Sequence, residues 1–229
     1  TNLLTVPLFI PTNHIETLHS GENINGVSNF SPLQYTKVHD YWGSMRDRIP
    51  ASKHHNFNSL YKKDNLKPMV SNTKENRIRV YLPDNFCIIR TAQNWSECSD
   101  EERDTYLSLV EPVLKQGEDY IRNNPTETGC LSSKFVYEIS LAGDSQDKSC
   151  VIAYFLSLSD LEDWSRAHPL HLNIYKTFFK MLEKYNFKTE LALWHEVSVL
   201  KKEQAIFEYI NCHSKTGLLP YSELQVTNY

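Results

Sequence analysis

The sequence predicts an α+β fold built from one antiparallel sheet and two helical segments. Between residues 86 and 200, predicted elements follow the order strand, helix, strand, strand, helix, strand. Strands are predicted where apolar residues alternate, and helices where apolar residues recur every three or four positions. This order is typical of a ferredoxin-like unit, whose helices cover one face of the sheet.

The first helix is predicted over residues 99–122, directly after a strand over 86–92. Ser99 and Glu102 have the spacing of a capping box, in which each side chain satisfies a free backbone donor at the helix start. Pro112 is expected to bend this helix because proline lacks a backbone N–H. The predicted inner face consists of Tyr106, Leu109, Val110, Val113 and Ile121.

The second half of the unit is predicted to be a hairpin followed by two helices and a strand. The turn residues Gly143 and Asp144 separate the hairpin strands. Pro169 is well suited to the first position of a helix. The predicted segments are the strands 131–141 and 149–157, the helices 160–167 and 169–185, and further strands over 77–82, 189–200 and 204–211. Residues 51–75, rich in Asn, Lys and Ser, are predicted to be loop.

The composition indicates a globular protein and argues against nucleic-acid binding and membrane insertion. A chain of 229 residues with 40% hydrophobic and 23% charged residues is typical of a globular protein with one large or two small domains. The net charge of −4, without a basic stripe, argues against a nucleic-acid partner. No apolar run approaches the length of a membrane span. Five scattered cysteines without a Cys-x-x-Cys pair indicate free thiols in a reducing, cytoplasmic setting.

His195 interrupts an otherwise aliphatic strand face. With period two, this face carries Leu191, Leu193, His195, Val197 and Val199. A buried imidazole needs a hydrogen-bond partner or a ligand, because leaving it unpaired costs roughly 1–3 kcal/mol. The two interpretations are a hydrogen-bonded core histidine and a site residue. If the uncovered face of the sheet packs on a second sheet, His195 is expected to point into the space between them.

His171 lies on a similar apolar face, in the first turn of the helix that begins at Pro169. That face continues through Ile174, Phe178, Met181, Leu182 and Tyr185. His168, which precedes proline, is instead expected to be extended and to cap the helix. One imidazole on a helix and one on a sheet suit a cofactor held between them, since a single helical histidine is a common haem ligand. The other imidazole could then act as acid or base, although packing in a core explains either histidine equally well.

Other polar residues have plain structural interpretations. Arg46 and Arg48 are typical of surface ion pairs, and Thr91 of packing on a strand. The structural interpretation of Glu16 is a charged residue exposed to solvent. No phosphate-binding glycine loop and no Gly-x-Ser-x-Gly motif is present.

Six segments spread along the chain carry a resemblance to a known family: 16–22, 41–48, 89–95, 168–171, 193–199 and 209–213. They include Met-Arg-Asp-Arg at 45–48, His-Pro-Leu-His at 168–171 and Trp-His-Glu-Val at 194–197. Together they resemble the aldoxime dehydratases, haem enzymes that convert aldoximes to nitriles, and especially the phenylacetaldoxime dehydratase branch.

The resemblance implies a domain arrangement. Members of this family pair two ferredoxin-like halves, in the manner of a dimeric α+β barrel, and this chain resembles them without roughly the N-terminal third. Residues 1–75 are then expected to be the end of the first half with long connecting loops. Residues 76–229 are expected to be the C-terminal, haem-binding half. The expected location is cytoplasmic, and the chain is a possible homodimer.

The resemblance also implies site residues. His171 would be the proximal ligand of haem b, and His195 the distal general acid and base. Arg48 and Glu16 would support His195 in proton relay. The Thr91 hydroxyl would bind the oxime OH, where many relatives have serine.

The implied reaction is the dehydration of arylaliphatic or aliphatic aldoximes, such as phenylacetaldoxime, by a carbon–oxygen lyase. The oxime nitrogen would bind ferrous haem. Two alternatives stay open: a non-catalytic haem-binding remnant, and a haem peroxidase or monooxygenase on the same fold.

Overall fold

The computed structural model describes residues 14–17, 45–67, 77–81, 83–204, 206–221 and 226–228. Only the backbone is described for residues 14–17, Arg48, Glu203, Ile206 and 226–228. Among the described residues, no helix is long and apolar enough to cross a membrane.

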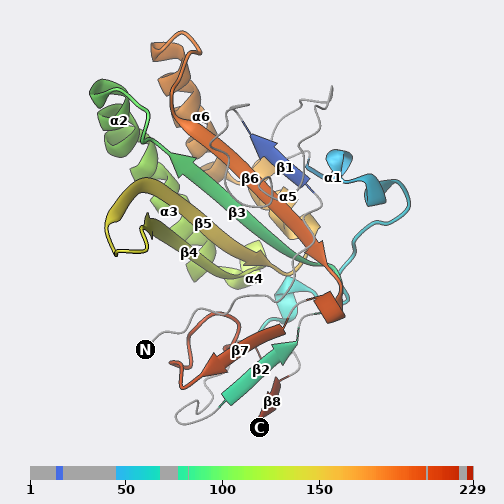
Figure 1. Cartoon of the computed structure of the whole chain (residues 1–229). Coiled ribbons are helices and arrows are strands. Elements are labelled where there is room, and N and C mark those ends of the chain that lie inside the picture. Colours follow the sequence, from blue (N-terminus) through green and yellow to red (C-terminus); the bar gives the residue numbers. More distant parts are fainter. Residues whose placement is uncertain are drawn as a thin grey trace.

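A five-stranded antiparallel sheet forms the centre of the molecule (Figure 1). Its strand order is β1-β6-β3-β5-β4, so the α+β class with an antiparallel sheet is confirmed. The strands are β1 (His14–Thr17), β3 (Phe86–Asn94), β4 (Cys130–Ile139), β5 (Ser145–Phe155) and β6 (Ala192–Leu200).

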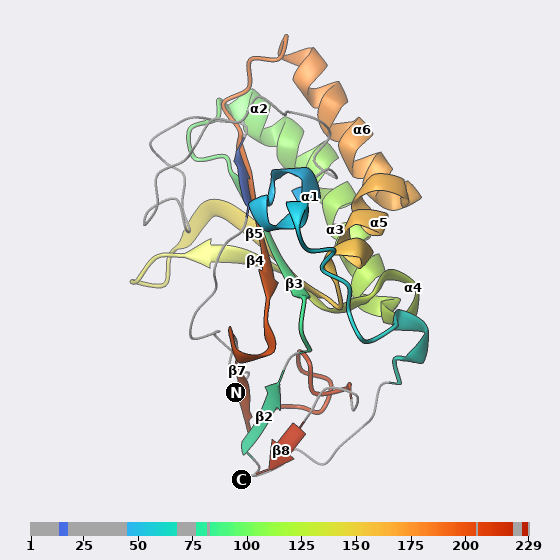
Figure 2. The same cartoon turned by 90° about the vertical axis from the view of Figure 1, so that its right-hand side faces the viewer.

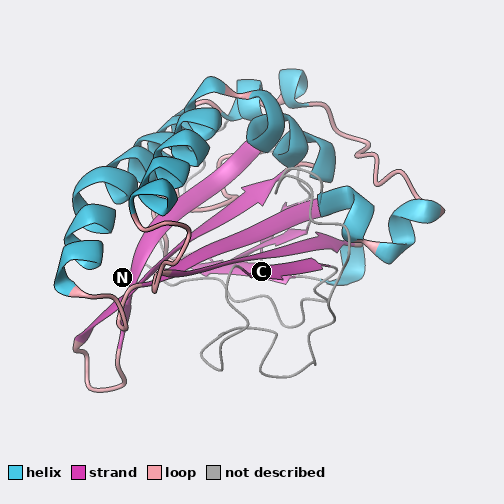
Figure 3. Cartoon of the chain, turned by 90° about the horizontal axis from the view of Figure 1, so that it is seen from above, coloured by secondary structure: helices cyan, strands magenta, loops and turns pink. Residues whose placement is uncertain are grey.

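The helices gather on one face of this sheet (Figures 2 and 3). The β3–β4 and β5–β6 connections each supply a group of helices, whereas β4 and β5 form a hairpin, so the predicted order of elements between residues 86 and 200 is confirmed. The first connection contains α2 (Asp100–Thr105), the π-helical segment η5 (Tyr106–Val110), α3 (Glu111–Asn123) and α4 (Pro125–Thr128). The second contains α5 (Leu158–Ala167) and α6 (Pro169–Lys184).

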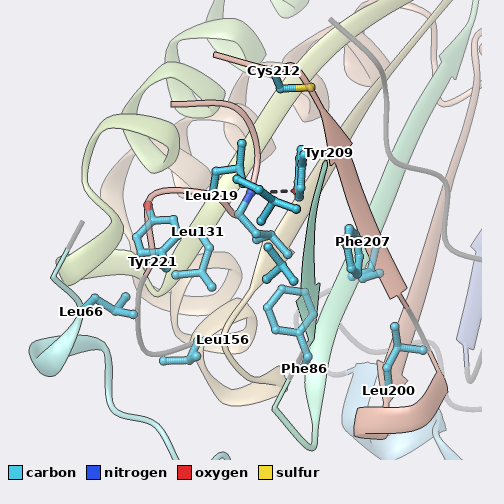
Figure 4. Close-up of a cluster of buried hydrophobic side chains, with 14 residues drawn as sticks. Leu66, Phe86, Leu131, Leu156, Leu200, Phe207, Tyr209, Cys212, Leu219 and Tyr221 are labelled. Carbon is cyan, nitrogen blue, oxygen red and sulfur yellow. Dashed lines mark hydrogen bonds between the residues drawn. The ribbon is translucent and has the colours of Figure 1, made fainter. Parts of the chain in front are cut away.

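A smaller sheet lies at one end of the large one and has the order β7-β2-β8 (Figure 1). Its strands are β2 (Arg77–Tyr81), β7 (Ile206–Ile210), which follows the short helix η6 (Lys202–Gln204), and β8 (Val226–Asn228). Although β2 directly precedes β3, the two strands belong to different sheets. A buried cluster joins the sheets, with Phe86 and Leu200 from the large sheet and Phe207 and Tyr209 from the small one (Figure 4). Within it, Leu218 N donates to Tyr209 Oη at 2.9 Å.

The described residues 45–67 are mostly irregular, in agreement with the predicted loop as far as residue 67. They contain α1 (Met45–Arg48) and two short 3₁₀ turns, η3 (Pro50–Lys53) and η4 (Lys63–Asn65). Met45, Ile49 and Phe57 are buried in a cluster under the helices. This segment is therefore packed onto the body of the molecule.

The predicted capping box is only half correct. Ser99 Oγ does accept from Glu102 N, at 3.4 Å, but Ser99 N donates to Glu190 Oε2, at 2.9 Å. The buried Glu102 carboxylate instead accepts from the Thr189 hydroxyl and from two backbone N–H groups, those of Glu190 and Leu191. It therefore ties α2 to the start of β6, a contact between residues far apart in the sequence.

The irregularity expected at Pro112 takes the form of a π-helical segment, η5, immediately before it. Proline has no N–H to donate to the preceding turn, which disturbs the α-helical ladder. The extra residue changes the phase of the helix. Tyr106 and Val110 are buried, whereas Leu109 is 58% exposed, so the prediction that Leu109 faces inward is wrong.

Candidate haem and substrate pocket

An apolar pocket lies between the helix layer and the five-stranded sheet. The space between its walls, including a part that is open to solvent, amounts to about 1030 Å³. Helical residues form one wall and the inward face of β3, β5 and β6 forms the other. The apolar wall residues include Ile89, Leu114, Ile121, Phe155, Ile174 and Phe178.

His171 enters this pocket from the helix side. His168 is extended, with φ −72° and ψ 130°, and its Nδ1 accepts from Leu170 N at 3.3 Å, so the predicted cap is confirmed. Pro169 then begins α6, which places His171 in the first turn. The Trp164 ring lies edge-on to the His171 imidazole, with centroids 5.8 Å apart.

The environment of His171 favours its neutral form. Burial, and to a smaller extent the neighbouring His195, lower the pKa of His171 to about 4. A hydrogen bond with the backbone of Ser165 acts in the opposite direction, as expected when a carbonyl accepts from the imidazole N–H. Metal-ligating histidines commonly donate their second ring N–H to such a carbonyl. His171 is thus neutral and oriented at neutral pH, as an iron ligand must be.

This shifted pKa predicts how the stability of the cofactor-free protein depends on pH. The imidazole pKa is 6.5 in the unfolded chain and about 4 in the folded protein. Between these values the unfolded state binds more protons, so the free energy of unfolding falls as the pH falls. The contribution is fully present above pH 6.5 and is lost as the pH approaches 4. Urea denaturation at several pH values should show a shallower dependence in His171→Phe than in the wild type, and equal dependences would contradict a buried neutral imidazole.

His195 enters the same pocket from the sheet side. Within the sheet, His195 of β6 lies opposite Thr91 of β3 on one side and opposite Glu16 of β1 on the other. His195 and Thr91 both line the pocket beneath the helices. The expectation that His195 would point between two sheets is therefore wrong. Both faces of β6 are largely buried, since Trp194 and Ser198 on the opposite face are 1% and 3% exposed.

The structure places the other predicted site residues near this pocket only through their backbones. Arg48 ends α1, whose first residue, Met45, lines the pocket, and Glu16 occupies the β1 position opposite His195. The side chains of both lie outside the described part of the structure. Arg46 binds the buried Glu162 carboxylate through Nε and Nη2, at 3.0 and 2.8 Å, so its interpretation as an ion-pairing residue is confirmed.

The residues present suit a haem. A single neutral imidazole with a backbone partner projects from a helix into an apolar pocket, which is the donor arrangement of haem sites with one axial histidine. On the opposite wall, an imidazole and a hydroxyl occupy neighbouring strands. No group of three or more His, Cys, Asp or Glu able to hold a metal ion occurs among the described residues.

Sequence reasoning missed three polar residues around the pocket. Gln93 shares a strand face with Thr91 by period two, and this could have identified it. Tyr106 was predicted only as an inward-facing residue, because the π-helical segment has no clear sequence signature. Ser165 carries no signal at all, since its contact with His171 is made by its backbone.

Sequence comparisons agree with this arrangement. Residues 7–218 match the family of haem-containing dehydratases. The phenylacetaldoxime dehydratase of Bacillus sp. (strain OxB-1) is 52% identical over 216 residues, which are 94% of this chain and 62% of the relative. The aliphatic aldoxime dehydratase of Pseudomonas chlororaphis is 40% identical over 209 residues, which are 89% of this chain and 57% of the relative.

Solved structures give the same result. An aldoxime dehydratase crystallised with butyraldoxime superposes with a TM-score of 0.79 at 35% identity, covering 93% of this chain and 58% of that one. A second aldoxime dehydratase structure gives a TM-score of 0.77 at 36% identity, covering 93% of this chain and 60% of that one. The chain thus spans about six tenths of the length of these relatives. By sequence and by fold, the chain belongs to the family of haem-containing dehydratases.

Proposed function

We propose that this protein dehydrates aldoximes to nitriles with the help of bound haem, as a carbon–oxygen lyase. Its substrates are arylaliphatic or aliphatic aldoximes, such as phenylacetaldoxime. The observation that carries the proposal is the single apolar pocket that receives His171 from the helix layer and His195 from the sheet.

His171 would hold haem b through its imidazole, and the Ser165 backbone would keep the imidazole oriented. When bound, ferrous haem would supply the electron density that weakens the N–O bond of the oxime. The edge-on Trp164 ring restricts rotation of the His171 ring. These contacts place the imidazole before the cofactor arrives, which lowers the entropic cost of binding.

His195 would move two protons in succession. As imidazolium it would donate a proton to the oxime hydroxyl oxygen while the N–O bond breaks and water leaves. The neutral imidazole would then take the proton from the oxime carbon, whose C–H electrons complete the nitrile triple bond. One group can serve both steps because it donates first and accepts second. The products are one nitrile and one water per aldoxime.

Thr91 is suited to orient the leaving hydroxyl, because register places it directly opposite His195 on the pocket wall. Glu16 holds the corresponding position on the other side of His195. We assign Glu16 and Arg48 to the proton relay that restores the charge of His195. The apolar walls exclude water and accept a hydrophobic side chain, which supports an arylaliphatic or aliphatic substrate.

The arrangement of elements supports a finer description of the fold. We assign residues 76–229 to a C-terminal ferredoxin-like, haem-binding half of a tandem pair, and residues 1–75 to the end of the first half with its loops. The strand order β6-β3-β5-β4, with helices in both crossovers, supports this assignment. A homodimer and a cytoplasmic location remain predictions.

Anaerobic assay of the reduced, haem-loaded protein with phenylacetaldoxime tests the activity. We expect phenylacetonitrile to accumulate in step with loss of the oxime. Haem binding without nitrile formation would contradict the proposal and favour a non-catalytic haem protein. Oxidation of a donor by peroxide, without nitrile formation from the oxime, would instead indicate a peroxidase.

A further inference from the structure

One end of the apolar pocket is polar. Tyr106 and Gln93 line it there, Ser149 lies behind Gln93, and each of the three is at least 96% buried. Ser149 Oγ donates to Gln93 Oε1 at 2.9 Å. Within the described part of the chain, the Tyr106 hydroxyl has no hydrogen-bond partner of acceptable geometry, although Ser149 lies close to it. Buried hydroxyl groups in native proteins nearly always have a partner, so this one indicates an additional ligand.

The backbone directs Tyr106 into the pocket. Tyr106 is the first residue of the π-helical segment η5, and Val110 is the last. Both line the pocket, whereas Leu109 between them points outward and is 58% exposed. The Trp95 ring packs against the Tyr106 ring, with centroids 5.3 Å apart, and limits its movement. Single π-helical turns within α-helices occur frequently at functional sites.

The polar end lies at a useful distance from the proposed reacting groups. Gln93 follows Thr91 by two residues on β3, and both line the pocket. Two residues of a strand span roughly 7 Å. This is comparable with the distance from an oxime carbon, across a benzyl group, to a substituent in the para position. An arylaliphatic aldoxime held at His195 therefore reaches the polar end with the far side of its ring.

The surroundings of Tyr106 keep its hydroxyl protonated. Burial raises the pKa of Tyr106 and outweighs the nearby Ser149 hydroxyl, which lowers it, while the Glu111 carboxylate raises it as well, so Tyr106 can donate a hydrogen bond. A neutral hydroxyl can both accept from Tyr106 and donate to an amide oxygen, which suits the pair of Tyr106 and Gln93.

We propose that Tyr106 and Gln93 bind a neutral hydroxyl at the far end of the substrate side chain, so that the pocket prefers hydroxylated arylaliphatic aldoximes. This inference rests on the proposed function for the orientation of the substrate. The competing occupant of the polar end is an ordered water that bridges Tyr106 and the Oε2 atom of Glu111, which also lacks a partner among the described residues.

Calorimetric titration of the haem-loaded protein with the two nitrile products, phenylacetonitrile and 4-hydroxyphenylacetonitrile, tests the proposal. We expect the hydroxylated nitrile to bind about fivefold more tightly to the wild type, the value of one net hydrogen bond. Tyr106→Phe should bring the two dissociation constants close together, and Gln93→Leu should reduce the ratio if the phenylalanine variant fails to fold. The matched control is Tyr137→Phe, because Tyr137 donates to Glu111 at 2.7 Å but does not line the pocket. It should keep the wild-type ratio.

Equal affinities in the wild type would overturn the proposal and assign the polar end to water. A ratio that survives in Tyr106→Phe would also overturn it. So would weaker haem retention in that variant with an unchanged ratio, since the hydroxyl would then serve the cofactor. The titration does not depend on turnover. Failure of the proposed activity would appear separately, as absence of nitrile formation from either aldoxime.

Discussion

Replacing His171 by alanine is expected to abolish stoichiometric haem retention. His171 is the buried imidazole that α6 directs into the pocket, and burial keeps it neutral and available to iron. Loss of a residue that merely orients a metal ligand typically costs 10- to 100-fold in metal affinity, so loss of the ligand itself should cost at least about 100-fold. The haem-to-protein ratio after gel filtration measures this directly.

The neighbouring His168 provides a matched control. His168 caps α6 through Nδ1 and does not line the pocket. Asparagine is a good capping residue, so His168→Asn should fold and keep its haem. Full haem retention by His171→Ala would show that the ligand is a different residue. Loss of haem from both variants would indicate that the start of α6, rather than the imidazole, is what matters.

Replacing His195 by alanine is expected to leave haem bound but to lower nitrile formation by about 10²- to 10⁴-fold, the usual contribution of a general acid or base. The side chain lies on the sheet wall, opposite the helix that carries His171. Its removal therefore deletes the proposed proton donor without touching the iron ligand. Single-turnover assays of the reduced protein with phenylacetaldoxime, together with the haem content, separate the two roles.

His54→Ala is the matched control for this experiment, because His54 is exposed and does not line the pocket. It should retain both haem and turnover. Near-normal turnover in His195→Ala would remove the acid–base role from this residue. Loss of haem from His195→Ala would instead indicate that the sheet wall supports the cofactor, which the arrangement of the pocket does not predict.

Local patterns in the sequence predicted the elements that build the pocket. The period-two alternation of side chains along a strand placed His195 on a face of aliphatic residues. Those residues are indeed buried, since Leu191 is fully buried and Val197 is 1% exposed. The preference of proline for the first position of a helix predicted the start of α6 at Pro169. The extended conformation of the residue before proline predicted the capping role of His168. Because these signals lie within a few residues of each other, they predicted that one imidazole comes from a helix and one from a strand.

Features that depend on distant parts of the chain could not be predicted in this way. Both faces of β6 are mostly buried, with Trp194 on one and Val197 on the other, so alternation alone could not decide which face meets the helices. The Glu102 carboxylate accepts hydrogen bonds from Thr189, Glu190 and Leu191, which lie 87 to 89 positions further along the chain. A local capping motif cannot reveal such distant partners. Pro112 predicted a disturbance of the helix, but it could not show that the disturbance is a π-helical turn that directs Tyr106 into the pocket.

The pocket between His171 and His195 is tested most directly by titrating the purified protein with haem, reducing it and recording its visible spectrum before and after adding phenylacetaldoxime. We predict saturable uptake of one haem per chain and a shift of the ferrous spectrum when the aldoxime is added. Absence of saturable uptake would contradict the assignment of this pocket as a haem site. A haem spectrum that does not respond to the aldoxime would contradict its assignment as the substrate site.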